Sequence, residues 1–213
     1  MVKSRPPTGG RGQARTRLAR TAVVTAARTL FLERGYPGTT VDAISELSDV
    51  PPATVYRLFA SKLGILKALL DFSIAGDDAP VAVSDRPPVR AAMTTDDPRA
   101  TLAGFVGITR DINSRAAPVY QILVSAAAAD AEAADLLAEL TRQRDQGQRQ
   151  VVRALARGGA LRADLRPRDA EDIVHALMSP EVYRLLVVDR GWTPGRYADW
   201  LARTLAEQLL SGG

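Results

Sequence analysis

The sequence predicts an all-α protein. Apolar residues recur at helical spacing along most of the 213 residues, and no stretch alternates apolar and polar residues between turn signals as a strand would. The alanine-rich stretch 125–140 has high helix propensity. Prolines, glycines and hydroxyl-bearing residues stand where helices are expected to begin or end. A composition of 46% hydrophobic and 24% charged residues is ordinary for a globular chain.

The first helix is expected to follow a disordered basic arm. Residues 1–14 are rich in glycine, proline and basic side chains and show no periodicity, which is typical of a disordered segment. From residue 15 the apolar positions repeat at helical spacing up to residue 34. Gly35 then supplies the left-handed residue that commonly ends a helix.

Two short helices are expected next. Thr39 is the predicted N-cap of the first, with Ile44 and Leu47 facing inward. The turn at residues 48–51 ends in a pair of prolines, which can open a helix but cannot lie inside one. The second short helix is therefore predicted over residues 52–58.

The remainder is expected to be a larger helical unit. Residue 61 is the predicted cap of a helix over 61–75, and residues 76–97, rich in proline and aspartate, are predicted to be a mobile linker. Pro180 is expected to kink or split the helix in which it lies. Further helices are predicted over residues 98–114, 118–128, 131–157, 168–190 and 194–210. The predicted organisation is thus an arm (1–14), an N-terminal domain (15–60) and a C-terminal domain (61–213).

The positive charge is concentrated at the N-terminus. Residues 1–62 hold ten Lys and Arg against four Asp and Glu, a net charge of +6, whereas residues 63–213 hold 18 against 20, a net charge of −2. This asymmetry favours a polyanionic partner, either nucleic acid or an anionic membrane surface. A solvated arm that serves only solubility is the alternative.

The composition disfavours several classes of protein. There is no cysteine and a single histidine, His175, so disulfides, thiolate metal sites and a histidine-based catalytic triad are not expected. We therefore expect no catalytic residues, no metal and no cofactor. No apolar run is long enough for a membrane span or a signal peptide, so a cytoplasmic protein without a membrane partner is expected.

The second short helix displays an unusual outer face. Val55, Leu58 and Phe59 form one apolar stripe, and the opposite face carries small, hydroxyl, phenol and guanidinium groups. Two short helices joined by a tight turn are typical of the helix-turn-helix motif, whose second helix enters the major groove of DNA. The predicted DNA-contacting residues are Thr40, Pro52, Ala53, Thr54, Tyr56, Arg57 and Lys62. The alternative is that Tyr56 packs in the core and Arg57 extends over it.

Residues 27–70 resemble the DNA-binding region of the TetR family of bacterial transcriptional repressors. The resemblance rests on Phe31, Gly35, Tyr36, Thr39, Thr40, Ile44, Val50, Tyr56, Phe59, Ser61 and Lys62. The departures from the family pattern are Asp49, Pro51, Pro52, Leu63 and Gly64. Asp49 stands where a glycine is usual, in a turn whose left-handed backbone aspartate tolerates better than most residues. Gly64 stands within a helix, where it is expected to cost about 1 kcal/mol.

The resemblance implies a homodimer that binds a pseudo-palindromic operator and is released by an apolar small-molecule effector. Under this hypothesis the residues near the effector pocket are Phe105, Ile108, Tyr120, Leu123, His175, Met178 and Tyr183. The dimer-interface candidates are Leu185, Val188, Trp200, Leu201 and Leu205. Core packing is the alternative for each of these residues, and His175 is predicted to be a hydrogen-bonded core histidine rather than a ligand contact.

Three functions compete at this stage. The first is the effector-responsive repressor. The second is a helical small-molecule-binding protein or enzyme whose basic N-terminus is incidental, although no set of nucleophile, base and orienting group supports an enzyme. The third is a membrane-surface or architectural protein that uses the arm alone.

Overall fold

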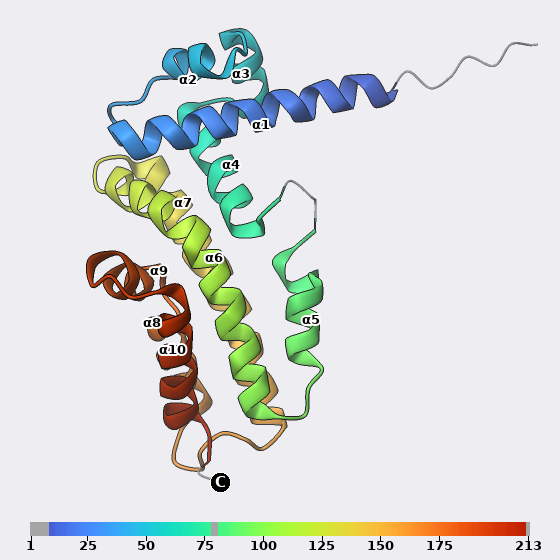
Figure 1. The fold of residues 1–213 in the computed structure, drawn as a ribbon, viewed down its shortest axis with the longest axis vertical. Helices are drawn as coiled ribbons and strands as arrows, with labels where there is room; N and C mark the ends of the chain where they lie inside the picture. Colours follow the sequence, from blue (N-terminus) through green and yellow to red (C-terminus); the bar gives the residue numbers. More distant parts are fainter. Residues whose placement is uncertain (1–8, 78–80, 212–213) are drawn as a thin grey trace, which may run out of the picture.

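The computed structural model describes residues 9–77 and 81–211, and within these ranges the protein is built from helices (Figure 1). Its elements are α1 (Gly9–Arg34), α2 (Val41–Ser48), α3 (Pro52–Phe59), α4 (Lys62–Ala75), the short 3-10 helix η1 (Val83–Asp85), α5 (Pro87–Met93), α6 (Pro98–Ala127), α7 (Ala131–Arg157), α8 (Pro167–Leu177), α9 (Pro180–Tyr183), the π-helix η2 (Arg184–Asp189) and α10 (Pro194–Leu209). The described ranges contain no strand, only an isolated antiparallel bridge between Leu161 and Leu210. The predicted all-α class is confirmed.

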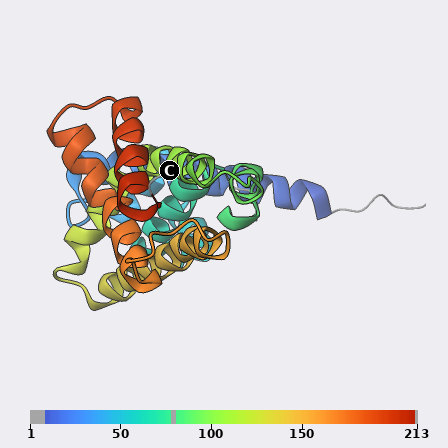
Figure 2. The ribbon, with the colours of Figure 1, turned by 90° about the horizontal axis from the view of Figure 1, so that it is seen from below.

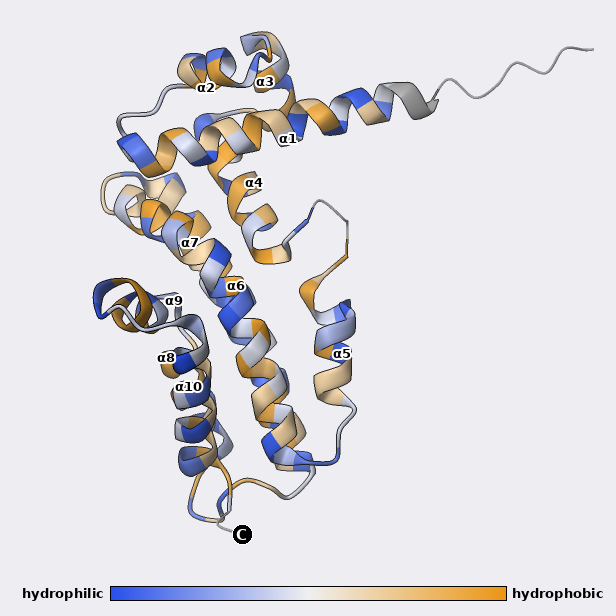
Figure 3. Ribbon diagram, in the orientation of Figure 1, coloured by the Kyte–Doolittle hydropathy of each residue, from blue (hydrophilic) through white to orange (hydrophobic). Residues whose placement is uncertain are grey.

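Helix α6 is the centre of the arrangement. It packs against α4, α5, α7, α9 and α10. Helix α1 lies across one end of the molecule, with α2 and α3 on its outer side, and its N-terminal half projects beyond the other helices (Figures 1 and 2). Apolar residues run along α4, whereas polar and apolar residues alternate along α10 (Figure 3). The amphipathic helix α10 therefore covers one side of α6 while its polar face turns outward.

Proline and short polar side chains set the helix starts. Helices α3, α5, α6, α8, α9 and α10 each have proline in their first turn, where the missing N–H is not needed. The N-caps whose side chains accept a backbone hydrogen bond are Thr40, Ser61, Asp97, Asp130, Ser179 and Thr193. These local signals explain why most of the starts were predictable.

Two hydrophobic clusters hold the helices together. The first joins α1–α4 to the corner where α6 meets α7, through residues such as Val119, Leu123 and Leu140. The second joins α5, the N-terminal part of α6, the C-terminal part of α7, and α8, α9 and α10. The packing is continuous across residue 60, so α1–α4 share their core with the α6–α7 corner rather than forming a separate core.

Two predicted segments differ from the structure at their boundaries. Helix α1 begins at Gly9, so residues 9–14 of the predicted arm are helical, while residues 1–8 lie outside the described residues. The predicted linker 76–97 contains η1 and α5, and residues 78–80 within it are not described. Val89 and Ala92 are buried, and Arg86 binds Asp77 through two hydrogen bonds of 2.8 Å. Local apolar contacts thus order a segment whose composition suggested a linker.

Proline had opposite effects at two places. Pro118 lies inside the single helix α6, so the predicted break between residues 114 and 118 is absent. The neighbouring Ala116, Ala117 and Val119 are buried, and this packing outweighs the missing backbone hydrogen bond. Pro180, in contrast, begins α9 after α8 has ended, which confirms the predicted split.

Candidate nucleic-acid interface and effector cavity

The start of α2 is fixed by two threonines with different roles. The Thr40 side chain accepts the N–H of Ala43 at 3.1 Å and is the N-cap, whereas Thr39 had been predicted to cap. Thr39 is buried and donates to the carbonyls of Leu30 at 3.1 Å and Gly35 at 2.8 Å. It therefore ties the start of α2 to α1 and leaves Thr40 exposed at the helix N-terminus.

The turn between α2 and α3 depends on Asp49. This residue has φ 52° and ψ 34°, the left-handed conformation expected from its position in the pattern. The Ser45 hydroxyl donates to the carbonyl of Val50 at 2.6 Å and closes the turn. Leu47 is 54% exposed, so the prediction that it faces inward is wrong, while Ile44 is fully buried.

Helix α3 presents the outer face that the sequence predicted. Val55 and Phe59 are buried and Leu58 is half-buried, whereas Tyr56 is 51% exposed. Arg57 is exposed and makes no hydrogen bond or ion pair within the described chain. Pro52 and Ala53 are also exposed, and Thr54 is half-buried. The alternative in which Tyr56 packs in the core is excluded.

Helix α3 is anchored on α1 by an arginine. The Arg20 guanidinium donates to the carbonyl of Leu58 at 3.1 Å and lies 4.8 Å from the centroid of the Phe59 ring. This contact fixes the C-terminal end of α3 against α1. The helix therefore presents Tyr56 and Arg57 from a rigid support.

Lys62 has an internal role that was not predicted from the sequence. Its ammonium donates to the carbonyls of Tyr36 at 2.8 Å and Thr39 at 3.0 Å, and it lies 4.2 Å from the centroid of the Tyr36 ring. Burial lowers the pKa of Lys62, and the Asp130 carboxylate opposes this shift. Lys62 thus joins the start of α4 to the α1–α2 turn, and its contact with DNA stays a prediction.

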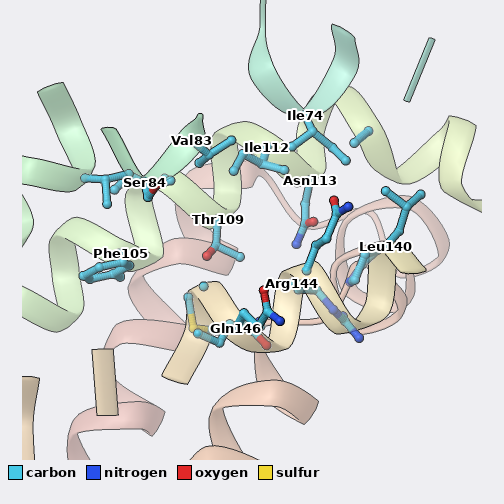
Figure 4. Close-up of a pocket in the computed structure, with 18 of the residues that line it drawn as sticks. Ile74, Val83, Ser84, Phe105, Thr109, Ile112, Asn113, Leu140, Arg144 and Gln146 are labelled. Atoms are coloured by element: carbon cyan, nitrogen blue, oxygen red, sulfur yellow. The ribbon is translucent and has the colours of Figure 1, made fainter. Parts of the chain in front are cut away.

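A cavity of about 500 Å³ lies among α4, η1, α6 and α7 (Figure 4). Of the predicted pocket residues, Phe105, Ile108, Tyr120 and Met178 line it. Further apolar lining residues come from α4, η1, α6 and α7 and include Leu70, Ile74, Val83, Ile112 and Leu140. The cavity therefore adjoins α4, the helix that follows α3 directly.

Three predicted pocket residues lie elsewhere. Leu123 is fully buried in the cluster shared with α1–α4. Tyr183 is buried against Tyr197, with ring centroids 5.0 Å apart. His175 lies behind the cavity wall, where its Nδ1 is 3.1 Å from Oε1 of Gln148 and its Nε2 is 3.1 Å from Nη2 of Arg144. The prediction of a hydrogen-bonded histidine is confirmed.

The polar lining of the cavity was not predicted from the sequence. Asn113 and Arg144 line it, together with glutamines of α7 at positions 143, 146, 148 and 150. The signals available were the polar run 142–150 and the single asparagine of the chain within an otherwise amphipathic helix. Neither pattern indicates a site by periodicity alone, because polar runs on helices are usually solvated faces.

The predicted interface residues divide into two groups. Leu185 is 50% exposed and Val188 is 62% exposed, both on the π-helix η2. Leu201 and Leu205 are fully buried in the second cluster, so they belong to the core of the protomer. Trp200 is half-buried, and its ring centroid lies 6.0 Å from that of Trp192.

Two searches of the described residues bear on other functions. None of the helices in the described ranges is both long and apolar enough to cross a membrane. Within the same ranges, no group of three or more His, Cys, Asp or Glu side chains is placed to hold a metal ion.

The exposed α3, the left-handed turn before it and its anchoring on α1 form a helix-turn-helix motif, which is typical of DNA-binding proteins. Residues 23–69 match the family described as "Bacterial regulatory proteins, tetR family". The N-terminal region is therefore that of a TetR-family transcriptional regulator, as the residue pattern had predicted.

Relatives with similar sequences bear regulator names. The chain is 29% identical over 179 residues to the uncharacterized HTH-type transcriptional regulator YdeS of Bacillus subtilis, covering 83% of each chain. It is 41% identical over 61 residues to the HTH-type transcriptional regulator TcmR of Streptomyces glaucescens, covering 29% of this chain and 27% of TcmR. The second match is thus confined to one region.

Solved structures share the fold. NalD, the secondary repressor of the MexAB-OprM multidrug efflux pump in Pseudomonas aeruginosa, superposes with a TM-score of 0.68 at 20% identity and covers 92% of this chain and 98% of NalD. A regulator from Saccharomonospora viridis in complex with choline gives a TM-score of 0.68 at 19% identity, covering 91% of this chain and 98% of that structure. At this identity the likeness concerns the fold alone.

Proposed function

We propose that the protein is a homodimeric repressor that binds a pseudo-palindromic operator in the cytoplasm and is released from it by a small-molecule effector. The observation that carries the proposal is the outer face of α3, where Tyr56 and Arg57 are exposed above a buried Val55 and Phe59. Residues of this kind on the second helix of the motif read base edges in the major groove.

The proposed DNA contacts divide by chemistry. Arg57 supplies a guanidinium suited to a guanine edge, and Tyr56 supplies a phenol of similar reach. Ala53 is small and exposed, which permits a close approach to a thymine methyl group. Thr40 lies at the N-terminus of α2, where the helix dipole and a hydroxyl favour a phosphate. Pro52 and Thr54 complete the proposed surface.

The proposed dimer forms through the surface around η2. Leu185 and Val188 are large apolar residues that are exposed in the protomer, and they lie on the same six-residue π-helix. Exposed apolar residues grouped in this way are typical of an interface between proteins. A second copy that covers them would place two recognition helices on one duplex.

The proposed effector acts through α4. Leu70 and Ile74 of this helix line the cavity. Arg115 of α6 holds the end of α4, since its Nε donates to the carbonyl of Ser73 at 3.0 Å and its Nη2 donates to that of Ile74 at 3.3 Å. Suppose that two positions of α4 give two separations of the α3 helices in the dimer. A ligand that binds one position more tightly then shifts the equilibrium toward that separation, to an extent set by the difference in its affinities for the two states.

Salt-dependent binding to DNA tests the proposal. The protein is titrated with the palindromic sequences upstream of its own gene, with random DNA of equal length and with anionic lipid vesicles. A repressor is expected to prefer one palindrome and to lose affinity as salt rises. Equal binding to palindrome and random DNA supports the architectural alternative, and binding to vesicles alone supports the membrane alternative.

A further inference from the structure

Asn113 carries a buried amide whose nitrogen has no partner. The residue is 4% exposed, and its Nδ2 makes no hydrogen bond with any described residue. It is the single asparagine in the chain, it lines the cavity, and its amide points into it (Figure 4). Because buried amide donors in folded proteins are nearly always hydrogen-bonded, a bound acceptor is expected to complete this one.

The neighbouring Tyr197 hydroxyl can engage no more than one of the two N–H groups of Asn113. The Tyr197 hydroxyl lies beside Asn113 on the α10 side, and burial raises the pKa of Tyr197 to about 12, with the Asn113 amide opposing the shift. The hydroxyl nevertheless has no hydrogen-bond partner of its own among the described residues. The amide nitrogen of Asn113 carries two N–H groups, so when one approaches the Tyr197 hydroxyl the other stays available to a bound acceptor.

A second unused donor belongs to Arg144. Its Nη2 is 3.1 Å from Nε2 of His175, while its Nη1 is buried and makes no hydrogen bond within the described chain. Nη1 lies 3.8 Å from the carboxylate of Glu181, which is an ion-pair distance. The charge of Arg144 is therefore already balanced, so an acceptor that reaches Nη1 does not need to be an anion.

The remaining lining groups carry no charge. No aspartate or glutamate is among the described residues that line the cavity, so a cationic ligand would find no counter-charge there. The polar lining consists of amides and hydroxyls such as Thr109, Gln143 and Gln146. Phe105 and Ile108 belong to the apolar part of the lining. A matching ligand has an apolar body and a neutral hydrogen-bonding end.

We propose that this cavity binds an uncharged amphipathic carbonyl compound, such as a ketone, ester or amide, whose oxygen accepts the Nδ2–H of Asn113. The apolar body of the ligand lies against Phe105 and Ile108. This inference rests on the proposed function only in taking the cavity as the effector site.

Four fluorescent probes on one skeleton test the charge and the acceptor. The parent is a dimethylamino-naphthyl ethyl ketone, and its analogues replace the ketone group by a propyl, a carboxylate or a trimethylammonium-methyl group. Each is titrated with the full-length protein and followed by its emission. We expect the ketone to bind at least about tenfold more tightly than the carboxylate and the ammonium analogues, because these would place an uncompensated charge in the cavity.

The variant Asn113→Leu removes the donor and keeps the approximate size of the side chain. It is expected to weaken ketone binding by about fivefold to tenfold, the effect of one uncharged hydrogen bond. Binding of the propyl probe, which has no acceptor, is expected to be unchanged or tighter. The control Gln150→Leu makes the same kind of change at an exposed residue of the rim and is expected to affect both probes equally.

Several results would overturn the inference. Equal losses for ketone and propyl probes in Asn113→Leu would give Asn113 a structural role only, and a carboxylate or ammonium probe that binds as tightly as the ketone would refute the preference for a neutral ligand. If Asn113→Leu does not fold, the four probes on the unaltered protein still decide the preferred charge. If the protein binds its palindrome but none of the probes, the inference about the ligand is wrong and the proposed regulatory function stands. If it binds the ketone but not DNA, the inference about the ligand stands and the proposed function is wrong.

Discussion

Gly64 lies in the first turn of α4, where that helix follows the end of α3. A Cβ at this position would overlap the carbonyl oxygen of Phe59 and lie 3.1 Å from its carbonyl carbon. The Gly64 N–H also donates to the Ser61 side chain at 3.0 Å. The sequence indicated only the helix-propensity cost of a glycine. The structure shows that the close approach of two backbones requires it.

Two glycine-to-alanine variants separate these effects. Gly64→Ala is expected to lower the free energy of unfolding by about 1–3 kcal/mol, because backbone must move to admit the methyl group. Gly107→Ala in α6 meets nothing within 4 Å and is expected to raise it by about 0.5–1 kcal/mol through helix propensity. Urea denaturation measures both. Stabilisation by both variants would show that the Phe59 contact is easily relieved.

The hydrogen bonds of His175 fix its tautomer. Arginine has no acceptor, so Nε2 of His175 must accept the N–H of Arg144, and Nδ1 must donate to Oε1 of Gln148. Burial and the Arg144 charge both lower the pKa of His175, against weaker opposing effects of Asp145, Glu181 and Asp172. The imidazole is therefore neutral in the folded protein at pH 7.

Proton NMR tests this assignment, because the chain has one histidine and therefore one set of imidazole signals. The signals are expected to titrate below the ordinary pKa of about 6.5. A folded-state pKa below the unfolded value means that the stabilisation is present above about pH 6.5 and is lost as the pH falls through the folded-state pKa. Replacement by Gln should flatten that dependence, and a titration above 6.5 would contradict the Arg144 contact.

At the scale of elements, helix starts were predictable and helix partners were not. The proline pair before α3 and the prolines that open α6 and α10 act locally, so the sequence reveals them. The helix break predicted before Pro118 was wrong because the burial of the neighbouring residues keeps α6 continuous. That burial depends on the tertiary fold and cannot be seen in the local sequence. The spacing of Leu201 and Leu205 predicted an apolar face on α10. It did not indicate that α6 and α8 of the same protomer cover this face.

The outer face of α3 gives a prediction for the recognition of the operator sequence. Arg57→Ala is expected to weaken operator binding by about 1–3 kcal/mol and to relax the preference at one base pair, as for an arginine that contacts guanine. Arg99→Ala, an exposed arginine at the far end of α6, is the control and is expected to change nothing. Fluorescence anisotropy with operator variants measures both. An equal loss on all sequences would assign Arg57 to a phosphate.

The projecting N-terminal half of α1 gives a prediction for electrostatics. Replacing Lys3, Arg5 and Arg11 by Gln removes one basic residue of α1 and two that precede it in the sequence, and keeps the length of the chain. The slope of log K against log salt is expected to become shallower by about 0.9 for each phosphate that is no longer neutralised. Affinity measured across a salt series gives the slope, and an unchanged slope would show that the segment does not touch DNA.

At the scale of the whole molecule, the site was only partly predictable. Phe105 and Met178 were expected near the cavity because the family resemblance implies an effector pocket among these helices. The roles of Asn113 and Arg144 were not predicted because they depend on the packing of α6 against α7. The role of Arg144 also depends on its ion pair with Glu181 of α9. Such polar sites arise from tertiary contacts that no local pattern encodes.

The last prediction concerns assembly. Two recognition helices must lie about 34 to 36 Å apart to enter successive major grooves, which a dimer joined through the η2 surface would provide. Leu185→Asp combined with Val188→Asp is expected to give a monomer by light scattering, since both side chains are exposed and apolar in the protomer. Leu32→Asp, also exposed but on α1, is the control and is expected to remain dimeric. The monomer is expected to lose operator affinity steeply, because one eight-residue α3 offers few base contacts. A double variant that stays dimeric would move the interface to another surface, and a monomeric variant that binds the operator with full affinity would refute the two-helix geometry.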